Sequence, residues 1–147
     1  MRSVAPILIS LAAALVGCNA QPEAPGVEIE NARITLPAVK GRPGAAYFKA
    51  EADTADRLTA ISSPRVGRIE LHESMAGGMG PLKDSSIPAD GELAFEPGGK
   101  HAMLFELDPT LKVGDSIPLT FSFERAPPVT VQAELLGPGS ASSHAGH

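Results

Sequence analysis

Short runs of alternating polarity, separated by turn residues, fill most of the chain and leave little room for helices. Between Leu119 and Phe123, for example, every second residue is apolar and the intervening residues are polar. A period of two predicts a β-strand with one buried face. The strand candidates span residues 27–36, 45–50, 57–62, 68–73, 92–96, 101–107, 117–124 and 129–136.

Turn chemistry lies between several of these runs, as in Asp90-Gly91, Pro97-Gly98-Gly99 and Gly114-Asp115. After the amino-terminal segment, no long window shows good helical periodicity. About eight short strands in about 110 residues predict an all-β fold. We therefore expect a β-sandwich or small barrel whose strands are all, or nearly all, antiparallel.

The amino terminus has the features of an export signal. Arg2 precedes an apolar run over residues 4–16, and Gly17-Cys18 follows it. The run is shorter than the about 20 residues of a transmembrane helix. The ending Leu-Val-Gly-Cys resembles the bacterial lipobox, which implies cleavage before Cys18 and lipidation of its thiol. A plain signal peptide with a chance cysteine, or a retained apolar anchor, is the alternative.

We expect four segments. Residues 1–17 are the lipoprotein signal peptide, and residues 18–25 are the lipidated cysteine and a polar, proline-containing tether. Residues 26–136 form one β-domain, and residues 137–147 form a flexible tail that carries His144 and His147. The whole chain has a net charge of −5, and removal of Arg2 with the signal makes it −6. This acidity argues against nucleic acid as a partner.

Histidines and methionines gather in two places along the chain. His72 ends the run Arg-Ile-Glu-Leu-His, in which Ile69 and Leu71 share one face while Glu70 and His72 share the other. His101 and Met103 stand two apart after a Gly-Gly turn, so a strand would place both on one face. Two more methionines lie in a glycine-rich segment expected to be a loop, Met75 and Met79.

This ligand set suits a soft metal. Thioether sulfur favours Cu(I), and imidazole binds both oxidation states of copper. Calcium and magnesium prefer oxygen ligands, and structural zinc usually draws on cysteine. Cys18 is the only cysteine, so a lipidated chain has no thiolate for the site. We therefore predict a Cu(I) site of His72, Met79, His101 and Met103, with Met75 in reserve. The tail residues His144 and His147 are candidates for a second site that takes Cu(II).

Other interpretations remain open. Met103 alone is typical of a core methionine, and a lone surface histidine usually has no ligand. The chain could be a lipid-anchored scaffold or adhesion module without metal, or a copper-sequestering resistance protein. An enzyme is disfavoured, because the sequence shows no nucleophile with a base, no carboxylate pair and no cofactor fingerprint.

Several stretches resemble the periplasmic copper chaperones called PCuAC, from residue 27 to residue 136. They include NARITLPAVKGRPGAAYFKA, RLTAISSPRVGRIELHES and the segment from IPADGELAF to LTFSFE. The copper motif of that family is a histidine, a methionine and, after 21 residues, a His-x-Met pair. Here residues 80–100 separate Met79 from His101, which matches that spacing. Between His72 and Met79 only residues 73–78 intervene, whereas about ten are usual in the family, so this loop is shorter.

The resemblance implies a cupredoxin-like Greek-key β-sandwich with a Cu(I) site near its surface. It also implies a non-enzymatic copper chaperone whose partner is cytochrome c oxidase, at its CuA centre, or a thiol-bearing assembly protein. We expect a monomer in the periplasm, held by the lipid on Cys18. Asn19 follows that cysteine where an aspartate would favour inner-membrane retention, so we expect the outer membrane.

Overall fold

A computed structural model describes residues 26–140 of the chain. Each of the eight predicted strands is present, and two short strands add to them. The strands are β1 (Val27–Thr35), β2 (Gly44–Ala52), β3 (Asp56–Ser62), β4 (Val66–Met75), β5 (Gly78–Pro81), β6 (Ser86–Ile87), β7 (Gly91–Phe95), β8 (Lys100–Leu107), β9 (Ser116–Phe123) and β10 (Val129–Leu136). The predicted all-β class is confirmed.

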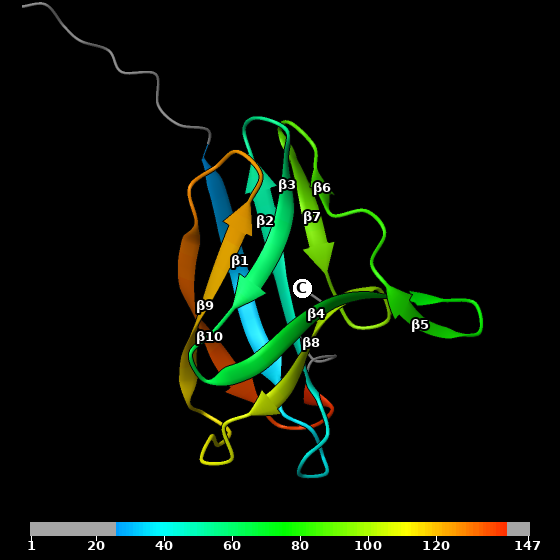
Figure 1. Cartoon of the computed structure of the whole chain (residues 1–147), viewed down its shortest axis with the longest axis vertical. Coiled ribbons are helices and arrows are strands. Elements are labelled where there is room, and N and C mark those ends of the chain that lie inside the picture. Colours follow the sequence, from blue (N-terminus) through cyan, green and yellow to red (C-terminus); the bar gives the residue numbers. More distant parts are fainter. Residues whose placement is uncertain (1–25, 141–147) are drawn as a thin grey trace, which may run out of the picture.

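The strands follow the order β5-β4-β8-β2-β1-β10-β9-β3-β6, and β7 pairs with β2 beside β8. All described pairs are antiparallel except β1 with β10, which is parallel. The sheet bends into two packed layers, and β3 and β9 lie in front of β1 and β2 in Figure 1. The architecture is a cupredoxin-like Greek-key β-sandwich, as predicted.

The core comes from the inward faces of the two layers. Phe48 of β2 stacks on Phe95 of β7, with ring centroids 4.3 Å apart, and meets Phe121 of β9 edge-on at 4.7 Å. Each such aromatic pair adds about 0.5–1.5 kcal/mol beyond the burial of its area. The buried apolar residues extend from Val27 to Leu135, so the described segment has a hydrophobic core of its own.

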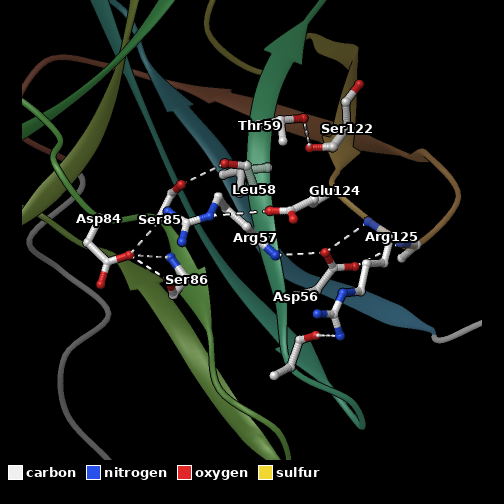
Figure 2. A network of polar contacts seen from close by, with 12 residues as sticks. Asp56, Arg57, Leu58, Thr59, Asp84, Ser85, Ser86, Ser122, Glu124 and Arg125 are labelled. Atoms are coloured by element: carbon white, nitrogen blue, oxygen red, sulfur yellow. Dashed lines mark hydrogen bonds and ion pairs between the residues drawn. The ribbon is translucent and has the colours of Figure 1, made fainter.

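A buried carboxylate joins β3 to the turn after β9, within the polar network of Figure 2. Asp56 Oδ1 accepts hydrogen bonds from the backbone N–H groups of Arg57 (2.7 Å) and Arg125 (3.0 Å). Its Oδ2 accepts one from the N–H of Ala126 (2.8 Å). Burial by itself would raise the pKa of Asp56, but these three donors outweigh it and hold that pKa below its ordinary value.

The strands β4, β5 and β8 make the part of the sheet that matters for the predicted site. β4 and β5 form a hairpin that projects from the side of the molecule, at the right of Figure 1. β4 also pairs along its length with β8. One correction follows: Met75 and Met79, expected in a loop, lie in paired strands joined by a tight turn at Ala76-Gly77.

Candidate metal centre

His72 and His101 lie directly opposite each other across β4 and β8. Their ring centroids are 6.1 Å apart, and the planes are tilted by 34°. Strand alternation explains this placement, because Leu71 packs against the core and Ala102 lies within it, while both imidazoles point to the outer face. They are nevertheless well covered: His101 is only 7% exposed, and the side chain of His72 is 18% exposed.

Each imidazole has one ring nitrogen held by an oxygen. His101 Nδ1 lies 3.0 Å from the backbone oxygen of Gly99, and His72 Nε2 lies 3.1 Å from Glu70 Oε2. A carbonyl oxygen and a carboxylate can only accept, so these two nitrogens carry the hydrogens. For neutral rings, this network assigns the hydrogens to His72 Nε2 and His101 Nδ1, which leaves His72 Nδ1 and His101 Nε2 as acceptors.

The two unprotonated nitrogens are buried and have no hydrogen-bond partner in the described structure. A buried acceptor without a partner is costly, by about 1–3 kcal/mol, and therefore calls for an explanation. A metal ion would satisfy both lone pairs, since neutral imidazole nitrogen is a common metal ligand. The geometry of this pair thus fits a metal.

Met103 lies on the same outer face, two residues after His101 and opposite Glu70 of β4. Met79 reaches that face from β5: it pairs with Ser74, which is two residues beyond His72 on β4. Diagonal cross-strand neighbours of this kind are about 7–8 Å apart, within reach of a long side chain. Met79 is 61% exposed, whereas Met103 is partly buried. The register therefore brings two thioethers to the face that holds the two imidazoles.

Met75 takes a different place. It pairs with Gly78 at the end of the hairpin, and it follows Ser74, so it lies on the opposite face from Met79. Its methyl group covers Gly80, where a Cβ atom would collide with it. The structure thus separates Met75 from the other four residues.

Three predicted functional residues lie outside the described residues: Cys18, His144 and His147. Within residues 26–140, His, Cys, Asp and Glu side chains form no cluster of three or more that could hold a metal. In that same part of the chain, no helix has the length and apolar character to cross a bilayer.

Two contacts of the site were not predicted. The Glu-x-His spacing at Glu70 and His72 places both side chains on one face of a strand, and it is the signal that could have revealed their hydrogen bond. The contact of His101 with the Gly99 carbonyl has no such signal, because it depends on the path of the backbone through the turn.

Known proteins with similar structures include PCuAC domains. The copper-bound PCuAC domain from PmoF2 is 24% identical with a TM-score of 0.67, and the match covers 78% of this chain and 97% of that one. The solution structure of apo-DR1885 from Deinococcus radiodurans is 25% identical with a TM-score of 0.59, covering 93% and 97%. That of CuI-DR1885 is 25% identical with a TM-score of 0.58, covering 82% and 83%. The PCuAC fold that the sequence motifs implied is confirmed.

A search of curated proteins finds no match to this chain. A family model, described as "Putative lipoprotein LpqE-like", matches residues 27–135, which is most of the chain and includes both paired histidines. The chain therefore belongs to the LpqE-like family and has the fold of a PCuAC domain.

Proposed function

We propose that this protein binds Cu(I) at the His72–His101 pair and passes the ion to another protein. The observation that carries the proposal is the pair itself: the imidazoles of His72 and His101 lie opposite each other, and each has a buried ring nitrogen without a hydrogen-bond partner. Copper is here a cargo, and the protein is a carrier with no catalytic step of its own.

The choice of Cu(I) rests on the thioethers. Met103 and Met79 lie on the face of the two histidines, and thioether sulfur favours Cu(I) over harder cations. The copper-bound structure of the PmoF2 domain supports copper as the metal, and the CuI form of DR1885 supports Cu(I). We propose His72, His101, Met103 and Met79 as the ligands, and we leave Met75 out.

The proposed ligands differ in exposure, and this difference suits the transfer of copper to another protein. Met79 is 61% exposed at the edge of the sheet, whereas His101 is 7% exposed. We propose that a ligand of the receiving protein displaces Met79 first and the buried ligands afterwards, so that copper is never free in solution. Without a thiolate in the site, no single bond holds the ion tightly enough to prevent this exchange.

We also propose a location and a recipient. The lipobox-like ending at Cys18 and the family description support a lipoprotein on the periplasmic face of a membrane, with the outer membrane favoured by Asn19. The recipient that the PCuAC resemblance supports is the CuA centre of cytochrome c oxidase or a thiol-bearing assembly protein. Buffering of copper without delivery is the competing outcome.

The proposal is tested by competition for Cu(I) between a chromogenic chelator and residues 18–147 carrying Cys18→Ser, a change that removes a competing thiol. We expect one tight equivalent that His101→Ala abolishes. Met79→Leu should weaken Cu(I) binding strongly and Cu(II) binding little, because it removes only the soft ligand.

Met75→Leu is the matched control, since it makes the same change on the other face of the hairpin and should leave the affinity unchanged. Binding that survives His101→Ala, or an equal loss for both ions in Met79→Leu, would contradict the proposed site and favour a scaffold without metal.

A further inference from the structure

We propose that Glu70 is a positioning residue for copper: its carboxylate orients His72 so that Nδ1 of this residue faces the metal. This inference rests on the proposed function. Glu70 does not itself touch the ion, and the two histidines differ in what orients them. His101 is oriented by the backbone, whereas His72 is oriented by a side chain.

The contact is local and directional. Glu70 and His72 stand two apart on β4, so both project from the outer face. Glu70 Oε2 lies 3.1 Å from His72 Nε2, and the imidazole is largely buried while the carboxyl group is 40% exposed. With its Nε2–H bound in this way, the ring can offer only Nδ1 as a metal ligand.

The second oxygen of Glu70 is also held. Arg68 Nε lies 3.2 Å from Glu70 Oε1, and the Arg68 guanidinium lies over the ring of Phe105 at 4.4 Å. Arg68 and Phe105 are cross-strand partners on β4 and β8, on the same outer face as the two histidines. These contacts restrict the rotamers of Glu70, but the pair is exposed, so we expect Arg68 to contribute less than the direct bond to His72.

A carboxylate in this position affects metal affinity in two ways. It fixes the tautomer and orientation of the ring, and its negative charge makes the imidazole a stronger ligand for a cation. Loss of such a partner typically lowers metal affinity by about 10- to 100-fold. The backbone carbonyl of Gly99 also fixes the tautomer and orientation of His101, but it carries no charge. Glu70 is thus the side chain through which substitution can tune the affinity of the site.

The test uses residues 18–147 with Cys18→Ser and compares Glu70→Ala, Glu70→Gln and the control Glu73→Ala. We expect Glu70→Ala to weaken Cu(I) binding by about 10-fold or more. Glu70→Gln should lose less, because its amide oxygen still accepts the Nε2–H. Glu73→Ala also removes a carboxylate from β4, next to His72 in the sequence. Because Glu73 lies on the other face of the strand and opposes Lys100, this change should leave Cu(I) affinity unchanged.

Nitrogen NMR of the two imidazoles in the metal-free protein separates positioning from a general loss of structure. We expect His72 in the Nε2–H tautomer in the wild type and in a mixture of tautomers in Glu70→Ala, with His101 unchanged in both. An Nδ1–H tautomer of His72 in the wild type, or full Cu(I) affinity in Glu70→Ala, would overturn the inference. If Cu(I) fails to bind the wild type, the proposed function falls; if only Glu70→Ala is without effect, this inference falls alone.

Discussion

At the scale of single residues, the side chains that matter most are polar groups buried beside the sheet. Asp56 is 8% exposed and accepts three backbone hydrogen bonds, and His101 is 7% exposed and accepts none at Nε2. The first group is fully satisfied and stabilises the fold. The second lacks a partner and indicates a ligand. The same degree of burial thus has opposite meanings, and the hydrogen-bond inventory distinguishes them.

Asp56→Asn should destabilise the protein by about 1–3 kcal/mol near neutral pH, because an amide group would face backbone N–H donors with one acceptor fewer. The folded pKa of Asp56 is lowered, so its contribution is complete above the ordinary value of 3.8 and is lost as the pH falls through the lowered pKa. Urea denaturation at several pH values measures this. The difference between wild type and Asp56→Asn should shrink below about pH 4.

Asp53→Asn is the control for that experiment, since Asp53 is exposed and the structure gives it no hydrogen bond or ion pair. It should leave the free energy of unfolding unchanged. A difference between wild type and Asp56→Asn that stays constant through the acid range would contradict the role of the ionised carboxylate.

At the scale of elements, the β4–β5 hairpin carries Met79 and places it on the face of the two histidines. β5 has four residues, two of them glycines, so neither its composition nor its length carries a strand signal. It is a strand because β4, anchored by Ile69 and Leu71, offers it a partner. For this reason the sequence predicts a loop for the glycine-rich segment. The clear alternation of β8, in contrast, correctly predicts that His101 and Met103 lie on one face.

Gly77 has a φ of 98° in the turn of this hairpin, a conformation that L residues rarely adopt. Gly77→Ala should destabilise the hairpin by about 1–3 kcal/mol. We expect faster hydrogen exchange at the amides of β5 and weaker Cu(I) binding, because Met79 is carried by this strand. Gly41→Ala places similar strain at a φ of 82° in the turn before β2 and should leave β5 exchange unchanged. Exchange at β5 that does not respond to Gly77→Ala would show that the turn does not hold Met79.

At the scale of the whole molecule, the alternation of polarity was enough to predict an all-β sandwich, but it could not predict which strands are neighbours. The pairing of β4 with β8 brings His72 opposite His101, although these residues are far apart along the chain. Local patterns carry no information on such non-local pairs. Only the spacing of the His-x-Met motif, through its resemblance to PCuAC proteins, linked the two segments in advance.

Delivery and buffering differ in their effect on a cell. If the protein delivers copper, a deletion strain should lose cytochrome c oxidase activity at low copper and regain it with added copper or the wild-type gene. His101→Ala should not restore activity, because its site cannot hold the ion. If the protein only buffers copper, oxidase activity should persist in the deletion strain, and growth should instead fail at high copper.

The parallel pairing of β1 with β10 has a consequence for how the protein is made. β1 pairs first with β2, which follows it directly along the chain, but its second partner, β10, comes last: Arg33 pairs with Glu134. Contacts between such distant segments form late, because closing a long loop is entropically unfavourable. The β1–β10 side of the sheet therefore cannot close until the last strand has been made. If the chain is exported before it folds, as we propose, this late closure keeps that side of the sheet open during transit, and a truncation before Val129 should leave β1 without its second partner.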